Sequence, residues 1–218
     1  QASLVAYQAV LQMPSAKHRA EAQRGHRRLK LFKHLRAPSI QLKVTPKLRT
    51  LLAELHEDGS TNRTLAELAR LQIDASSKPS KETRTQLHAL SAPPLWTDWL
   101  AARLAEAEGQ NKLALSHLAH LLARDDGFWP AHHLKGKILR HQKKFSEAIQ
   151  AYRSAYKAGS QIETLIELGQ VLGRAGRREE ALATLRDAAQ RGGLKPVIVD
   201  SIGRLQTEAG HHREAAAT

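Results

Sequence analysis

The chain has 218 residues, of which 41% are hydrophobic and 25% charged, a composition typical of folded globular proteins rather than disordered ones. It contains no cysteine, which excludes disulfides, thiolate nucleophiles and cysteine-bound zinc, and no apolar run approaches the roughly 20 residues that a membrane-spanning helix needs. The formal net charge of +13 points to an anionic surface or an acidic partner.

Most of the positive charge lies at the start of the chain. Residues 1–50 hold 11 lysines and arginines against a single acid, Glu21. Leucine and phenylalanine are interleaved with these cations in "RRLKLFKHLR", so we predict a basic helical region over residues 1–45 that contacts nucleic-acid phosphates, an anionic membrane surface or an acidic protein. The candidate contacts to nucleic acid or another anion are Arg27, Arg28, Lys30, Lys33 and Arg36.

Residues 46–94 predict a short helical block and linker. The stretch "TPKLRTLLAELHEDG" predicts a helix over about residues 46–56, "TLAELARLQ" a second, and "SSKPSKETRTQLHALSAPP" a third over about residues 80–90. The block resembles a winged-helix or helix-turn-helix unit, whose third helix enters the DNA major groove. That resemblance assigns nucleic-acid contacts to Lys81, Arg84, Thr85 and His88. The alternative is a helical block that packs on its neighbours and has no role in binding nucleic acid.

From about residue 95 onward the sequence repeats. Small residues recur at intervals of 34, 33 and 34, at Ala102, Gly136, Gly169 and Gly203. A second set keeps the same intervals, at Ala114, Ala148, Ala181 and Ala215. Apolar residues at helical spacing predict two amphipathic helices in each unit, with turns at Gly109, Lys143, Gly176 and Gly210. Small residues are needed where paired helices cross closely, and we expect Gly136 to face Ala148.

This pattern resembles the tetratricopeptide repeat family, in the units "WTDWLAARLAEAEGQNKLALSHLAHLLARDDG", "WPAHHLKGKILRHQKKFSEAIQAYRSAYKAG", "ETLIELGQVLGRAGRREEALATLRDAAQRG" and "VIVDSIGRLQTEAGHHREAAAT". The resemblance covers residues 95–218, about 3.5 repeats, the last one truncated. It implies an all-α fold, a helical-hairpin solenoid (a tetratricopeptide-type superhelix) preceded by the basic helical region. The units depart from the family at Ala102, which replaces a glycine, and at Lys135, where an apolar residue is usual.

The N-terminal stretch shows the same pattern more faintly. "VAYQAVLQMPSAKHRAEAQRGHRRL" resembles the end of one repeat and the start of another, with Gly25 as the small residue, so residues 1–45 are a candidate partial repeat. Together with the truncated last unit, this predicts that the chain is a segment of a longer protein.

In this family the first helix of each unit lines a concave groove that binds extended peptides or partner helices. By resemblance, the groove residues lie next to each small residue, three positions before it, or one turn further on. They are Trp99, Arg103, His133, Lys137, Arg140, Gln170 and Arg204, with Glu106, Ile166 and Asp200 beside them. The cations suit an acidic partner segment. The clamp of Lys, Asn and Arg by which members of this family bind chaperone tails is missing. The alternative to a binding role is that these cations form a solvent-exposed surface.

Motifs of catalysis are not evident. The sequence has no phosphate-binding glycine loop after a strand, no nucleophile elbow and no HExxH motif. His117 and His120 lie one helical turn apart, but the sequence shows no carboxylate that completes a metal site with them. We therefore predict no catalytic residue, no metal and no cofactor.

The sequence thus favours a non-catalytic scaffold that binds a protein or peptide partner, as part of a larger protein or assembly. Two alternatives stay open. One is a DNA-binding regulator in which the N-terminal block binds nucleic acid and the repeats sense a partner. The other is a helper segment of a larger enzyme or of a secretion machine.

Overall fold

A computed structural model describes residues 64, 66–67, 69–71, 81–90, 94–159 and 162–216. Every regular element in these residues is an α-helix, so the predicted all-α fold is confirmed. None of the helices in the described part of the chain combines the length and the apolar character needed to cross a membrane. The chain divides into two compact units, residues 1–117 and 118–218. The predicted basic region and the predicted helix over residues 46–56 lie outside the described residues.

The first unit contains the predicted third helix of the block, the first helix of the first predicted hairpin and the start of its second helix. The described residues between 64 and 71 are helical, as expected from "TLAELARLQ". Helix α5 (Lys81–Ala89) follows, then α6 (Pro94–Ala107) and α7 (Asn111–Arg124), which spans the division between the units. Helix α6 begins at a proline, a residue that suits the first turn because its missing N–H would have no partner there. The buried side chains of this unit include Leu87, Trp99, Leu100 and Leu104.

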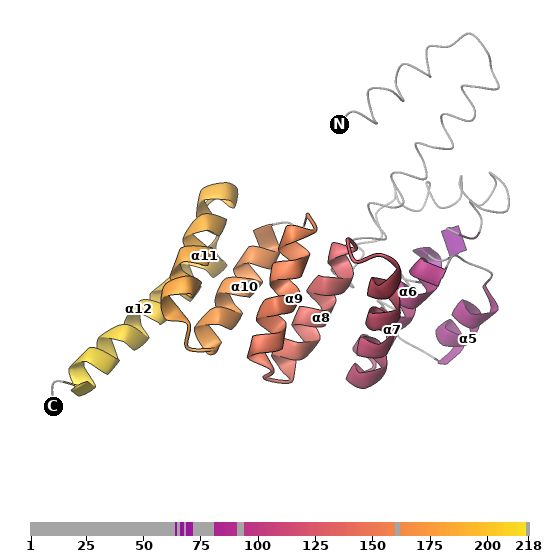
Figure 1. Ribbon diagram of the computed structural model, residues 1–218, viewed down its shortest axis with the longest axis horizontal. Helices are drawn as coiled ribbons and strands as arrows, with labels where there is room; N and C mark the ends of the chain where they lie inside the picture. Colours follow the sequence, from indigo (N-terminus) through magenta and orange to yellow (C-terminus); the bar gives the residue numbers. More distant parts are fainter. Residues whose placement is uncertain are drawn as a thin grey trace, which may run out of the picture. The chain divides into compact units, whose positions relative to one another are not determined.

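The second unit is a succession of helices joined by short turns, and Figure 1 shows them in chain order from pink to yellow. They are α8 (Trp129–His141), α9 (Phe145–Lys157), α10 (Ile162–Arg174), α11 (Arg178–Gly192) and α12 (Pro196–Ala216). Helices α8 and α9 pack as one antiparallel hairpin, and α10 and α11 as the next. Hairpin thus follows hairpin, as the repeated pattern predicted.

Small residues allow the helices of each hairpin to approach closely. A Cβ atom added to Gly136 would lie 2.9 Å from the ring of Tyr152, and one added to Gly169 would lie 2.6 Å from Leu185. Since real Cβ atoms do not come this close to other atoms, only glycine fits at either crossing. The atoms nearest to Gly136 belong to Tyr152, and not to Ala148 as expected from the sequence, although Ala148 is buried in the same hairpin.

The turns inside the hairpins share one geometry. Gly109, Lys143 and Gly176 have φ values of 74°, 60° and 77°, all in the left-handed region. After each of them, the next N–H donates to a carbonyl five residues back, as from Lys144 to Leu139 at 3.0 Å and from Arg177 to Leu172 at 2.9 Å. This is the Schellman arrangement that closes helix C-termini. Three of the four predicted turns are confirmed.

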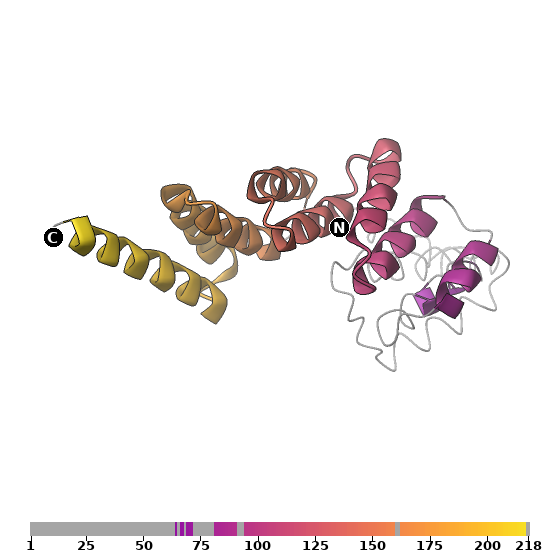
Figure 2. The same cartoon turned by 90° about the horizontal axis from the view of Figure 1, so that it is seen from below.

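The fourth predicted turn, at Gly210, is wrong. Helix α12 runs without interruption through Gly210 to Ala216, and Figure 2 shows it as one continuous helix. In the other hairpins the second helix brings a large side chain, Tyr152 or Leu185, back onto the first helix. Gly210 does not adopt the positive φ of Gly109 and Gly176, so the turn geometry of those hairpins does not form there.

Candidate functional site: the α8–α10–α12 face

The first helices of successive hairpins are joined by side-chain hydrogen bonds. His133 Nδ1 on α8 lies 2.8 Å from Thr164 Oγ1 on α10, and the Gln170 side-chain amide of α10 donates to Ser201 Oγ on α12 at 3.2 Å. Each bond connects residues 31 positions apart, and together they link α10 to a helix on each side of it. We call the surface formed by these three helices the α8–α10–α12 face.

The part of the face between α8 and α10 contains a hydrogen-bonded cluster of side chains. Arg140 donates to Glu167 Oε2, and the Tyr152 hydroxyl donates to the same oxygen at 3.2 Å. Burial, followed by the charge of Glu167, raises the pKa of Tyr152 above its usual range, so this hydroxyl stays protonated. The imidazole of His133 meets the Tyr152 ring edge-on, with ring centroids 5.4 Å apart, and burial lowers the pKa of His133. Arg140 is therefore already engaged by a carboxylate.

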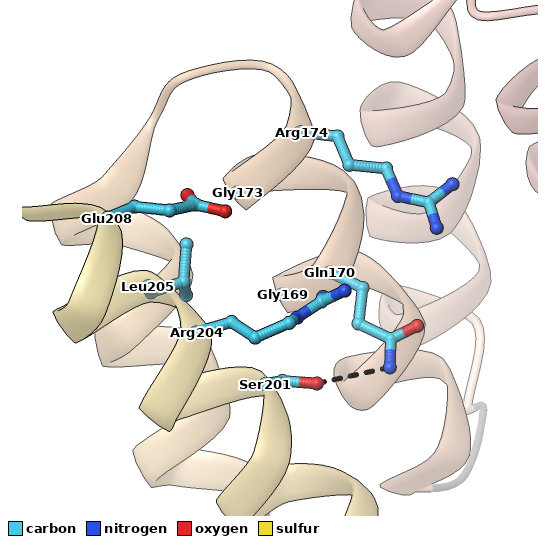
Figure 3. Close-up of a pocket in the computed structure, with 8 residues that line it drawn as sticks. All are labelled: Gly169, Gln170, Gly173, Arg174, Ser201, Arg204, Leu205 and Glu208. Atoms are coloured by element: carbon cyan, nitrogen blue, oxygen red, sulfur yellow. Dashed lines mark hydrogen bonds between the residues drawn. The ribbon is translucent and has the colours of Figure 1, made fainter.

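The part between α10 and α12 contains a cavity of about 290 Å³. It is shown in Figure 3 and is lined by Gly169, Gln170, Gly173, Arg174, Ser201, Arg204, Leu205 and Glu208. Gly173 lets α12 approach, because a Cβ atom there would lie 2.8 Å from Leu205. Ser201 is buried and donates its hydroxyl to the carbonyl of Val197 at 2.7 Å. The Gln170 amide nitrogen points to Ser201, and its oxygen points away from it (Figure 3).

Charged side chains surround this cavity. Arg204 extends from α12 across the cavity toward α10, Glu208 extends toward Gly173, and Arg174 points away from α12 (Figure 3). Arg204 Nε lies 4.0 Å from Asp200 Oδ2, and the two side chains are 56% and 72% exposed. An ion pair this long and this exposed contributes little to stability. The guanidinium of Arg204 can therefore exchange Asp200 for a carboxylate of a partner.

The hydroxyl of Ser201 is already engaged by the protein backbone. Ser201 directs its proton to a backbone carbonyl, and the residues that line the cavity include no histidine or other base positioned to activate that hydroxyl. The hydrogen-bonding and charged groups of the cavity suit a polar ligand segment.

The predicted groove residues fall into two groups in the structure. Trp99 and Arg103, in the first unit, are only 1% and 3% exposed, and the Arg103 guanidinium lies over the Trp99 ring at 5.4 Å. Burial lowers the pKa of Arg103 to about 10, with Glu106 acting in the opposite direction. These two side chains form part of an interior, as does Ile166 in the second unit.

The second group lies on the α8–α10–α12 face, where Arg204 is exposed and the others are half-buried. It comprises His133, Lys137, Arg140, Gln170 and Arg204. The structure brings Gln170 and Arg204 together at one cavity, whereas Arg140 and His133 belong to the hydrogen-bonded cluster around Tyr152.

The sequence analysis missed Arg174 and Glu208, which line the same cavity. Each lies four residues after a predicted groove residue, Gln170 or Arg204, and so one helical turn further along the same face. The repeat period held the signal, because both also lie five residues after a small residue, Gly169 or Gly203. Extending the predicted groove by one turn would have found them.

The candidate nucleic-acid contacts are only partly covered by the structure. Lys81 and Arg84 lie on α5, as predicted. The five N-terminal cations, from Arg27 to Arg36, lie outside the described residues.

A histidine of the first unit has a partner that the sequence analysis missed. His117 Nδ1 lies 3.4 Å from Asp98 Oδ1. The two residues are 19 positions apart and lie on different helices, so helical spacing alone could not pair them.

No protein-family model matches this chain, and a search of curated proteins finds no significant match. The functional conclusion therefore rests on the residues of the α8–α10–α12 face.

Proposed function

We propose that this chain is a non-catalytic interaction scaffold of the tetratricopeptide type, which holds a segment of a protein partner along the α8–α10–α12 face. The observation that supports it is the α10–α12 cavity, where hydrogen-bonding and charged groups from two repeats meet without a catalytic pair. A scaffold of this kind serves a larger protein or assembly.

The size and position of the cavity favour a peptide segment over a cofactor. Its volume of about 290 Å³ lies at the lower limit of small-molecule pockets, which start at about 300 Å³. Because α8, α10 and α12 repeat the same positions, an extended segment can continue from the cavity toward Lys137 on α8.

Selection of peptides from a random library on the immobilised full chain tests this function. The enriched peptides are then titrated against the wild type and two charge-reversal variants, Arg204→Glu on the face and Arg186→Glu on α11. Arg186 is exposed and does not line the cavity, so it is a matched control. We expect Arg204→Glu to weaken binding about tenfold or more and Arg186→Glu to have little effect. Equal binding to both variants would exclude this face as the binding site.

A second candidate function is favoured by the concentration of cations in residues 1–50. In this alternative the N-terminal region binds DNA and the repeats sense a partner. Fluorescence anisotropy of the full chain with labelled duplexes of several sequences, at low and near-physiological salt, separates the two. A sequence preference that persists as salt rises supports a DNA-binding regulator. Binding that is equal for all sequences and disappears with salt reports only the net positive charge.

A further inference from the structure

The exposed side of α12 carries charges in a fixed order. Asp200, Arg204 and Glu208 follow one another at intervals of four residues, and all three are exposed. Four residues of an α-helix advance by about 6 Å, so the three charges form a row with the order negative, positive, negative. The positive charge in the middle is the one that reaches across the α10–α12 cavity (Figure 3).

An extended peptide matches this row. Alternate side chains of an extended strand lie on the same side and about 6.6–6.8 Å apart, close to the spacing of the three charges on α12. A segment with a carboxylate in the middle and a cation two residues away on each side places its carboxylate at Arg204 and its cations at Asp200 and Glu208. Its charge order is the same in both directions, so the match does not depend on chain direction.

We propose that the α10–α12 cavity selects a partner segment by the order of its charges. The segment has five positions, with lysine or arginine at the first and the last, glutamate or aspartate in the middle, and any residue at the second and the fourth. This inference rests on the proposed function and names the chemistry of the partner at that face. It differs from the acidic partner expected from the net charge, because Asp200 and Glu208 would repel the outer carboxylates of a uniformly acidic segment.

Neighbouring groups support a single carboxylate at the centre. Arg140 is occupied by Glu167, and Arg174 points away from α12, which leaves Arg204 as the cation directed over the cavity among the residues that line it. The oxygen of the Gln170 amide, which points away from Ser201, is placed to accept a backbone N–H of the bound segment. The partner's carboxylate replaces Asp200 at Arg204, and Asp200 then faces the partner's cation.

Two labelled peptides of identical composition test the inference on the full chain. One carries the order Lys-Ser-Glu-Ser-Lys and the other Lys-Ser-Lys-Ser-Glu, in the same Gly/Ser context. Because their net charges are equal, any general attraction to the basic N-terminal region is the same for both. In fluorescence anisotropy titrations we expect the first peptide to bind about three- to tenfold more tightly, a preference that shrinks as salt rises. Equal affinities would overturn the inference.

A charge swap provides the second arm. The double variant Arg204→Glu, Glu208→Arg changes the row on α12 to negative, negative, positive, which matches the second peptide. Both residues are exposed, so we expect the melting temperature to stay close to that of the wild type. The preference between the peptides should reverse, and an unchanged preference would show that the peptides bind elsewhere.

Failure of this inference is distinguishable from failure of the proposed function. If neither peptide binds, charge-order selection is wrong, whereas peptides selected from the random library that lose affinity for Arg204→Glu would still support the scaffold. If those selected peptides also ignore Arg204→Glu, both proposals fail.

Discussion

The turn residue Lys143 shows what the repeat period demands of a single residue. Its φ of 60° makes it the one non-glycine residue with a positive φ in the part of the chain that the structure describes. Glycine occupies the equivalent positions, Gly109 and Gly176. A side chain in this conformation costs about 1 kcal/mol, because the Cβ atom approaches the following carbonyl. The α8–α9 turn therefore forms despite local strain.

We predict that Lys143→Gly raises the free energy of unfolding by up to about 1 kcal/mol, because glycine adopts the left-handed conformation without strain. Urea denaturation of the full chain measures the change. Lys157→Gly, at the exposed end of α9, is the control and should lower stability instead. A wild-type midpoint in Lys143→Gly would contradict the strain assigned to this turn.

His133 makes the second unit sensitive to pH. Burial lowers its pKa, with further effects from Glu167, Lys137, Arg140 and Glu163. Because its pKa in the folded state lies below the ordinary value of about 6.5, the unfolded chain binds more protons at acidic pH. The stabilising contribution of neutral His133 is complete above about pH 6.5 and is lost as pH falls toward its folded-state pKa.

We therefore predict that the free energy of unfolding falls between pH 7.5 and pH 5.5, and that His133→Gln removes part of this fall. Glutamine is chosen because it keeps a hydrogen-bonding group near Thr164. Urea denaturation of both proteins at the two pH values isolates the histidine from the other titrating groups. If the variant shows the full pH dependence of the wild type, other groups cause it.

At the scale of helices, two of the three glycines that share a repeat position, Gly169 and Gly203, differ in environment. A Cβ atom at Gly169 would meet Leu185 of α11, whereas one at Gly203 would meet nothing within 4 Å. The repeat makes the two positions equivalent in sequence, but only Gly169 is covered by a second helix. The sequence could therefore not distinguish them, since the distinction depends on packing.

We predict opposite effects of the same substitution at these two positions. Gly169→Ala should lower the free energy of unfolding by about 1–3 kcal/mol through overpacking. Gly203→Ala should raise it by up to about 1 kcal/mol, because alanine favours the helix and meets no obstacle. Thermal and urea denaturation of both variants provides the comparison. A loss of stability in Gly203→Ala would mean that another segment covers this side of α12.

The ion pair between Arg140 and Glu167 joins α8 to α10. Reversing one charge places two carboxylates side by side, so we expect Arg140→Glu to reduce stability by about 1–3 kcal/mol. The double variant Arg140→Glu, Glu167→Arg should recover part of the loss, and a double-mutant cycle from urea denaturation measures the coupling. Additive losses would show that the pair contributes no interaction of its own.

At the scale of the whole molecule, the repeat period predicted the helical hairpins and three turns correctly. It did not predict that the chain divides at residues 117 and 118, because the pattern of small residues continues unchanged through α6 and α7. It also placed Trp99 and Arg103 in an open groove, whereas both are buried in the first unit. Periodicity in the sequence shows which face of each helix is apolar. It does not show which of these faces pack against each other, and that packing determines where the chain divides into units.

We expect the rate of amide hydrogen exchange to differ along the second unit, according to how extensively each helix packs against its neighbours. Helices α9 and α10 each pack against neighbours in two hairpins. Among the side chains of α12 whose burial is described, the buried ones are Ile198, Ser201 and Leu205, which lie in its first half. We predict the slowest amide exchange in α9 and α10 and the fastest at the end of α12, as measured by mass spectrometry of peptic fragments. Equal protection of α10 and the end of α12 would contradict this order.

The hydrogen bonds on the two sides of α10 have a consequence for insertions and deletions. Thr164 bonds to α8 and Gln170 bonds to α12, so the number of residues between them determines their relative orientation around the helix. Deleting one residue between them would turn one side chain by about 100° relative to the other, so that only one of the two bonds could form. Loops can change length during evolution at little cost, but this stretch of α10 has to keep its length for α8 and α12 to stay in register.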